Sequence, residues 1–202
     1  WEKTINKIGI KNELLSVKEF QGKTRKDCAK IISNFLNNKF SLNKVLEIHS
    51  IFFNENMVNI KPILFAEELI DLCSFLNLDI ALVSSSSLES FNKKIREHPW
   101  LCKIKIKILG DNKNLKNRKP FPDPYLLAAS KLNIKISDCC AVEDSLAGVY
   151  SAFYAGCYVY CLDKFKNELK TNLSLNNFNI NHPRIKFIRS LREIIDLFEK
   201  NI

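Results

Sequence analysis

The stretch that decides the fold is AVEDSLAG, residues 141–148. The run CCAV, residues 139–142, has the apolar composition of a buried strand, and it leads into two adjacent carboxylates, Glu143 and Asp144. Small residues then recur at helical spacing, which predicts a helix that another part of the backbone can approach closely: Ala147, Gly148, Ser151, Ala152 and Ala155. Carboxylates at the carboxyl end of a strand in an open α/β sheet lie where such sheets bind ligands.

Two interpretations of Glu143 and Asp144 stay open on these residues alone. Oxygen ligands at this position suit Mg²⁺, which proteins bind through one or two carboxylates together with substrate phosphate. Alternatively, the two carboxylates only favour the start of a helix, where negative charge is stabilising. The choice between them depends on the rest of the chain.

The composition is that of an ordinary globular protein with excess positive charge. The chain has 202 residues, 46% of them hydrophobic and 26% charged, and its formal net charge is +9. This length accommodates one full domain and a smaller one. The charge raises the question of nucleic acid, but the lysines are spread along the chain and no nucleic-acid motif accompanies them, so we expect no such partner. The densest basic stretch, residues 103–119, could attract an anionic substrate.

The seven cysteines form no Cys-x-x-Cys pair. Four of them lie in apolar, strand-like runs, and we interpret these as small buried hydrophobic residues: Cys139, Cys140, Cys157 and Cys161. A reducing, cytoplasmic location is therefore expected. The sequence contains no recognisable signal peptide and no apolar run long enough to span a bilayer, so we expect no membrane partner. We also expect a monomer.

Residues 1–59 contain helical patterns and no convincing strand, which predicts a small helical module. Thr24 is a good helix cap, with Asp27 three residues further on. The helix that follows is expected to bury Ala29, Ile32, Phe35 and Leu36. A second patterned stretch runs from residue 42 to residue 52.

Residues 60–202 alternate between strand and helix patterns, which predicts a parallel sheet covered on both faces. Strands are expected at residues 80–83, 103–108, 139–142, 157–162 and 185–188. Ser86 with Glu89 resembles a capping box for the helix after the first strand, and Asp123 is a good cap for the helix near residue 126. Gly156 is expected to end the helix that follows Asp144.

Three features occur in a fixed order: a strand ending in Ser84, the phrase Lys119-Pro-Phe-Pro-Asp before a helix, and Glu143-Asp144-Ser145 followed by Gly148. Together they resemble the haloacid dehalogenase superfamily, specifically its β-phosphoglucomutase-like branch of sugar-phosphate phosphatases and mutases. The resemblance covers nearly the whole chain. It implies a Rossmann-like, parallel-sheet α/β core at residues 60–202 and an inserted α-helical cap at residues 1–59.

The resemblance implies phosphoryl transfer to and from a small phosphorylated metabolite through an aspartyl-phosphate intermediate. Ser84, helped by the backbone amide of Ser85, would hydrogen-bond the phosphoryl group, and Lys119 would neutralise its charge. Asp144 would bind Mg²⁺, with Glu143 as a further ligand or behind it. Phosphoryl transfer depends mainly on positioning and charge neutralisation, which these residue types supply. Taken singly, Ser84 could merely end a strand and Lys119 could be a surface lysine; the Pro-x-Pro-Asp context favours the functional interpretation.

The helical module also has a counterpart in this branch. Residues 22–25, Gly-Lys-Thr-Arg, match the loop that sets substrate specificity, so Gly22, Thr24 and Arg25 become candidate substrate-binding residues. Arg25 would grip a distal phosphate of the substrate through two hydrogen bonds. A surface arginine near a helix start is a common alternative.

The first motif of the superfamily, Asp-x-Asp-Gly, does not occur in these 202 residues. Its first aspartate is the nucleophile and its second the general acid/base, a covalent strategy open to carboxylates. Because the chain begins at Trp1, we expect the motif to precede it in the native protein, and we expect the chain as given to lack turnover. The leading function is a Mg²⁺-dependent phosphatase. A phosphosugar mutase, a non-catalytic phosphate-binding protein and, last, a nucleic-acid binder are the alternatives.

Overall fold

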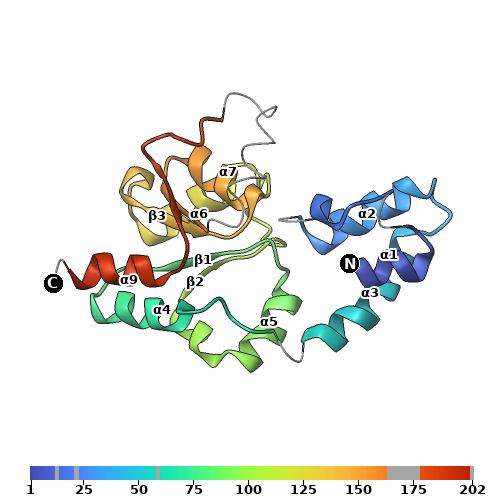
Figure 1. Ribbon diagram of the computed structural model, residues 1–202, viewed down its shortest axis with the longest axis horizontal. Helices are drawn as coiled ribbons and strands as arrows, with labels where there is room; N and C mark the ends of the chain where they lie inside the picture. Colours follow the sequence, from blue (N-terminus) through green and yellow to red (C-terminus); the bar gives the residue numbers. More distant parts are fainter. Residues whose placement is uncertain (12–13, 21–22, 58–59, 163–177, 201–202) are drawn as a thin grey trace.

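A helical lobe stands beside a larger α/β lobe (Figure 1). The computed structural model describes residues 1–202 except 12–13, 21–22, 58–59, 163–177 and 201–202. Gly22 and most of the polar stretch between residues 164 and 181 lie outside the described residues.

In its described residues, the helical lobe consists of three helices and a short 3-10 turn: α1 (Glu2–Ile8), η1 (Val17–Phe20), α2 (Arg25–Phe35) and α3 (Leu42–Met57). The expected cap of α2 is confirmed, because the Thr24 hydroxyl accepts a hydrogen bond from the Asp27 amide at 3.2 Å. Ala29 and Ile32 are fully buried as expected. Phe35 was expected on the same face but is 43% exposed; it is the last residue of α2.

The α/β lobe contains every strand that the structure describes. In chain order its elements are α4 (Ala66–Phe75), β1 (Ala81–Val83), α5 (Leu88–Glu97), η2 (Pro99–Lys103), β2 (Ile106–Ile108), α6 (Asp123–Leu132), η3 (Ile136–Asp138), β3 (Cys140–Glu143), α7 (Leu146–Ala155), β4 (Tyr158–Leu162), β5 (Ile185–Ile188) and α9 (Arg192–Glu199). The alternation of strands and helices that the sequence predicts is confirmed.

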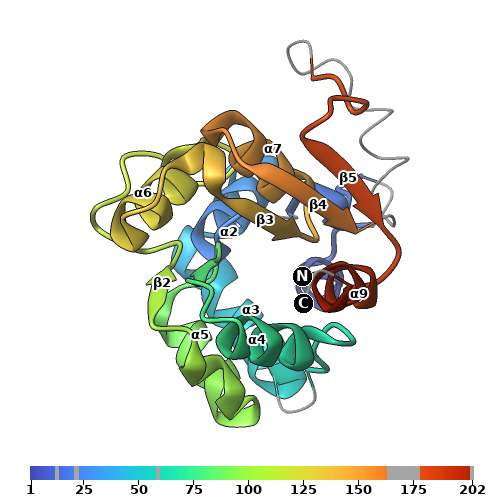
Figure 2. The same cartoon turned by 90° about the vertical axis from the view of Figure 1, so that its left-hand side faces the viewer.

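The strands form two parallel sheets rather than one continuous sheet. Strand β1 pairs with β2, with Ala81 opposite Ile106. Strand β4 lies between β3 and β5, with Val159 opposite both Ala141 and Ile185. Among the described strands, β1 and β3 each have an edge without a hydrogen-bonded neighbour. All pairings within the two sheets are parallel, and Figure 2 shows β3, β4 and β5 side by side.

Helices cover the three-stranded sheet from both sides (Figure 2). On one face, α6 and α7 bury a cluster against β3, β4 and β5 that includes Tyr125, Val149, Ala152 and Val159. On the other, α4 and α9 pack through Leu69, Ile194 and Phe198 against the ends of β4 and β5. The two layers of helices and the sheet between them confirm the α/β fold class.

Two local expectations were wrong. The Lys/Ile alternation over residues 103–108 gives a strand only at β2, because Pro99 starts a 3-10 turn that runs to Lys103. The side chain that caps α5 is Ser87 rather than Ser86: its hydroxyl accepts from the Ser90 amide at 3.3 Å. A run of four serines offers several capping hydroxyls, and the sequence pattern does not tell them apart.

Of two further expected helix ends, that at Gly156 is confirmed and that at Asp123 is wrong. Gly156 ends α7 with φ +113°, a left-handed conformation that suits glycine, as expected. Helix α6 begins at Asp123, with Pro122 in the capping position, so Asp123 is the first helical residue rather than the cap. Its carboxylate accepts instead from the Asn117 amide at 3.0 Å and so closes the loop that precedes the helix.

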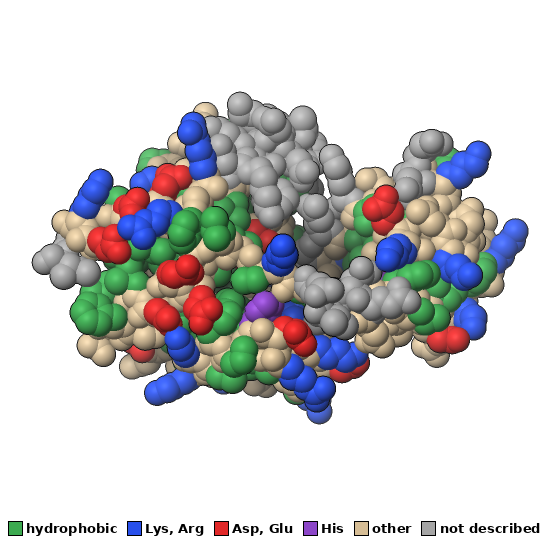
Figure 3. Space-filling view, turned by 60° about the horizontal axis from the view of Figure 1, so that its bottom comes forward, with side chains coloured by type: hydrophobic (Ala, Val, Ile, Leu, Met, Phe, Trp, Pro, Cys, Tyr) green, Lys and Arg blue, Asp and Glu red, His purple; other side chains and the backbone are tan. Residues whose placement is uncertain are grey.

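The face shown in Figure 3 mixes Lys and Arg side chains with Asp, Glu and apolar ones. Within the described ranges, no helix has both the length and the apolar character needed to cross a membrane. All seven cysteines are free thiols.

Candidate active site

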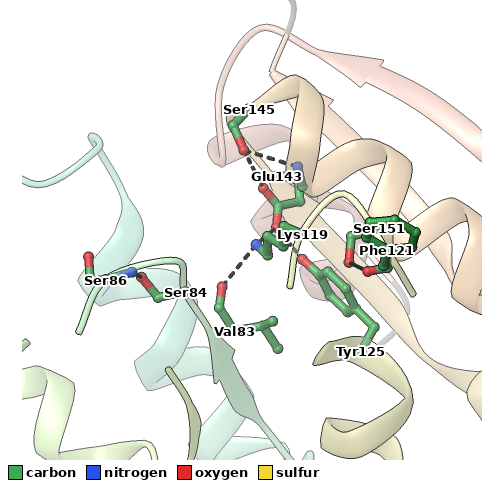
Figure 4. A network of polar contacts seen from close by, with 10 residues as sticks. Val83, Ser84, Ser86, Lys119, Phe121, Tyr125, Glu143, Ser145 and Ser151 are labelled. Carbon is green, nitrogen blue, oxygen red and sulfur yellow. Dashed lines mark hydrogen bonds and ion pairs between the residues drawn. The ribbon is translucent and has the colours of Figure 1, made fainter. Parts of the chain in front are cut away.

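Lys119 connects the two sheets at their carboxyl ends (Figure 4). Its ammonium donates a hydrogen bond to the carbonyl oxygen of Val83, the last residue of β1, at 3.0 Å. The same ammonium forms an ion pair with the carboxylate of Glu143, the last residue of β3. Both side chains are buried, with 7% of Lys119 and 5% of Glu143 exposed. The lysine therefore lies between the last residue of β1 and the last residue of β3.

The loop that carries Lys119 is held from the other side by α7. The Ser151 hydroxyl, in the second turn of α7, donates to the carbonyl oxygen of Phe121 at 2.6 Å. This bond ties the Lys-Pro-Phe-Pro-Asp phrase to the helix that follows Glu143. Lys119 is consequently positioned by residues on both sides of its loop.

Three neighbours donate to the Glu143 carboxylate and a fourth makes room for it. Besides Lys119, the phenol of Tyr125 donates a hydrogen bond to it, and the Ser145 hydroxyl donates to its Oε2 at 3.3 Å. Gly148 leaves room for it, because a Cβ at position 148 would lie 1.8 Å from Oε2. Burial, followed by the negative charge of Glu143, raises the pKa of Tyr125 well above its usual value, so this phenol remains a donor.

Sequence reasoning found Glu143 and Gly148 but gave no role to Tyr125. The signal was present in the phrase Pro-Asp-Pro-Tyr, in which Tyr125 falls in the first turn of α6. That turn starts only a few residues after Lys119.

The backbone after β1 forms a tightly held loop beside Lys119. The Ser84 amide donates to the Ile108 carbonyl oxygen at 2.9 Å, which extends the pairing of β1 with β2. The Ser86 amide donates to the Ser84 hydroxyl oxygen at 3.1 Å, and the Gly110 amide donates to the Ser86 carbonyl oxygen at 2.9 Å. A Cβ on Gly110 would lie 2.3 Å from the carbonyl oxygen of Ser85, so only glycine fits there. The Ser84 hydroxyl keeps its own proton to donate to a ligand.

Asp144 is the acidic residue at this edge that faces solvent. Its side chain is exposed, and no described residue donates a hydrogen bond to its carboxylate. The described part of the chain contains no cluster of three His, Cys, Asp or Glu side chains that could enclose a metal ion. One free carboxylate fits a Mg²⁺ ion that is otherwise coordinated by water and substrate phosphate, which is how proteins usually bind it. Glu143 fits a supporting position better than direct coordination, because Lys119 and Tyr125 already donate to its Oε1 and Ser145 donates to its Oε2.

Of the three candidate residues in the helical lobe, the two that the structure describes, Thr24 and Arg25, bond within that lobe. Thr24 caps α2. The Arg25 guanidinium donates to the carbonyl oxygen of Leu46 at 3.0 Å and to the Ser50 hydroxyl, both on α3, and stacks over the Phe53 ring at 5.3 Å. The structure thus brings together Ser84, Lys119, Glu143 and Asp144, and it binds Arg25 to α3.

Comparison with known proteins supports the family. A family model described as haloacid dehalogenase-like hydrolase matches residues 10–156. A bifunctional riboflavin kinase/FMN phosphatase of Arabidopsis thaliana is 34% identical over 128 residues, 62% of this chain and 34% of the relative. Hexitol phosphatase A of Escherichia coli is 45% identical over 49 residues, 24% of this chain and 23% of the relative. The chain spans less than two thirds of the length of the curated relatives it matches.

The fold is also similar to that of solved structures of such proteins. A β-phosphoglucomutase from Clostridium difficile superposes with a TM-score of 0.73 at 20% identity, over 99% of this chain and 86% of that one. At that identity the likeness concerns the fold. The family model covers most of the chain and includes the Ser84 loop, Lys119 and the Glu143-Asp144 pair. This protein belongs to the haloacid dehalogenase-like hydrolases.

Proposed function

We propose that this protein is part of a Mg²⁺-dependent phosphatase that hydrolyses a small phosphorylated metabolite, a sugar phosphate, through an aspartyl-phosphate intermediate. The observation that carries the proposal is the buried Lys119 ammonium between the Val83 carbonyl oxygen and Glu143, next to the loop that begins at Ser84. The phosphatase names of the two curated relatives support a hydrolase, and the hexitol phosphatase favours a sugar or sugar-alcohol phosphate.

In this proposal the residues of the site share one task, which is to hold and neutralise a phosphoryl group. The Ser84 hydroxyl and the Ser85 amide donate to its oxygens, and Lys119 stabilises the negative charge that develops during transfer. Asp144 holds Mg²⁺, and Glu143 keeps Lys119 in place. When bound, Mg²⁺ would supply further positive charge on the phosphoryl oxygens.

The nucleophile is proposed to be an aspartate outside these 202 residues. Two observations support its entry between β1 and β3: both strands have an edge without a neighbour among the described strands, and Lys119 spans the carboxyl ends of the two. A strand inserted there in parallel would satisfy both edges and bring its own carboxyl end to Lys119. Without that carboxylate the 202-residue chain should bind phosphate and show no turnover.

The helical lobe, residues 1–59, is proposed to be a cap over the α/β core, residues 60–202, with Gly22, Thr24 and Arg25 at its substrate-facing loop. A hydrogen bond links this lobe to the core: the Lys93 ammonium of α5 donates to the Asn54 amide oxygen of α3 at 2.9 Å. To reach a substrate, the Arg25 guanidinium would have to exchange its bonds to α3 for bonds to a distal phosphate.

The seven free thiols support a reducing, cytoplasmic location.

The test begins with the protein purified from its native source, because intact mass and N-terminal sequencing show whether an Asp-x-Asp-Gly motif is present. With that motif, Mg²⁺-dependent release of inorganic phosphate from hexose or hexitol phosphates is expected. An isomerised sugar phosphate without phosphate release would favour the mutase instead. A native protein without the motif that binds phosphate and hydrolyses nothing would establish the non-catalytic alternative.

A further inference from the structure

Lys94 places a second positive charge at the loop that begins at Ser84. It lies about two turns along α5 from the capping residue Ser87. Side chains on a helix lean toward its N-terminus, so a long lysine at this position can reach back to the loop. The Lys94 ammonium donates a hydrogen bond to the Ser86 hydroxyl oxygen at 3.0 Å.

The surroundings of this lysine are unusual for a surface helix. Its side chain is partly buried, and no carboxylate among the described residues forms an ion pair with it. Burial lowers the pKa of Lys94 from its usual value, while the negative charge of Asp144 opposes part of that shift. A partly buried ammonium that has only a hydroxyl as partner gains free energy when an anion binds beside it.

The charges at the site show why a second lysine matters. Lys119 is already paired with Glu143, so this buried pair adds no net charge. Lys94 donates to the Ser86 hydroxyl and forms no ion pair with a described carboxylate, so its charge is not cancelled in the same way. A phosphate dianion beside Ser84 would therefore need the charge of Lys94 in addition to that of Lys119.

We propose that Lys94 is a substrate-binding residue, a second lysine of the phosphate site, whose ammonium contacts the phosphate held by Ser84 and Lys119. This inference rests on the proposed function. It differs from the alternative that Lys94 only holds the loop through Ser86. If Lys94 acted solely through that hydrogen bond, removal of the Ser86 hydroxyl would do the same damage as removal of the ammonium.

The experiment measures binding of inorganic phosphate to the 202-residue chain by titration calorimetry, with Mg²⁺ present and at low ionic strength. Lys94→Met should raise the Kd by at least about tenfold, which corresponds to loss of a hydrogen bond to a charged group. Lys94→Arg and Ser86→Ala should stay within about threefold of wild type, because each keeps a cation at the site. Lys105→Met, which removes an exposed lysine at the amino end of β2, is the charge-matched control and should bind as wild type does.

Lys119→Met separates the two levels of the proposal. If it abolishes binding and Lys94→Met binds as wild type does, Lys94 is not a phosphate ligand and the proposed function stands. If Ser86→Ala matches Lys94→Met, the role of Lys94 is structural and the inference is overturned. If wild type binds no phosphate, or Lys119→Met binds it unchanged, the proposed function and the inference fail together. Circular dichroism melts establish that each variant is folded. If Lys94→Met does not fold, Lys94→Gln removes the charge while keeping a polar side chain, and it should raise the Kd by at least about tenfold as well; a Lys94→Gln variant that binds as wild type does would overturn the inference.

Discussion

A Cβ placed on Gly148 would lie 1.8 Å from Oε2 of Glu143, so the glycine of α7 and the carboxylate of β3 occupy adjoining space. That oxygen belongs to the end of a side chain, which in other surroundings could move aside. Here the carboxylate is held by Lys119 and Tyr125, and moving it would separate a buried ion pair. The glycine in the Glu-Asp-Ser-x-x-Gly phrase is therefore required by the carboxylate that precedes it.

Gly148→Ala is accordingly expected to destabilise the protein by about 1–3 kcal/mol, the usual cost of overpacking, and to weaken phosphate binding. Urea unfolding followed by circular dichroism measures the first effect and calorimetry the second. The control is Gly148→Ala in a Glu143→Ala background, where the clash is gone and the glycine substitution should cost much less. Equal costs in the two backgrounds would show that the carboxylate is not the obstacle.

The sequence predicts most of this site because its residues follow strands. Ser84, Lys119, Glu143 and Asp144 are adjacent to strand ends or to a Pro-x-Pro-Asp phrase, and parallel strands bring such positions to one edge. Lys94 could not be predicted this way, since it lies in mid-helix and reaches the loop only through the length of its side chain. The hydrophobic periodicity of residues 80–162 predicts the strands but not which strands pair. It therefore could not predict that β1 and β3 belong to two separate sheets.

Predictions for single segments also failed where the structure depends on residues outside the local pattern. The alternation of Lys and Ile over residues 103–108 satisfies the strand pattern. However, a 3-10 turn begins at Pro99 and includes Lys103, so the first of these residues is not in the strand. The role of Arg25 stays a prediction. Its position at the start of α2 was readable from the sequence, but its hydrogen bonds to α3 depend on how two helices pack.

The buried pair of Lys119 and Glu143 leads to a prediction about stability. Lys119→Met should cost about 3–5 kcal/mol, because it leaves a carboxylate buried without its counter-ion. The double variant Lys119→Met/Glu143→Leu should recover much of that loss, since no charge then remains buried. Equilibrium unfolding of both variants and of wild type measures the difference. A double variant no more stable than Lys119→Met alone would show that charge burial is not the cause.

His49 predicts how stability depends on pH. Burial, followed by the positive charge of Arg25, lowers the pKa of this imidazole to about 3, and its Nδ1 has no hydrogen-bond partner among the described residues. In the unfolded chain the pKa is about 6.5, so below that pH the unfolded state binds a proton that the folded state does not. The contribution of His49 to the free energy of unfolding is therefore fully present above about pH 6.5, and it decreases as the pH falls toward 3.

The His49→Phe variant keeps an aromatic ring between Trp1 and Phe53 but removes the titrating group. Between about pH 8 and about pH 5, the free energy of unfolding of wild type should therefore fall by about 2 kcal/mol more than that of His49→Phe. Chemical unfolding at the two pH values gives the difference directly. Parallel losses in wild type and His49→Phe would mean that His49 can be protonated in the folded state.

A substitution of Asp144 should change Mg²⁺-dependent phosphate binding without changing the stability of the fold. Its carboxylate is exposed and accepts no hydrogen bond from a described residue, so Asp144→Asn should leave the unfolding midpoint within experimental error. If this carboxylate holds Mg²⁺, the same substitution should remove the effect of Mg²⁺ on phosphate affinity, because the amide brings no charge to the metal. Calorimetric titration with phosphate, with and without Mg²⁺, measures this coupling. Asp79→Asn, an exposed aspartate before β1 at the opposite end of the strand, should retain it. A variant at position 144 whose phosphate affinity still responds to Mg²⁺ as wild type does would place the metal on other residues.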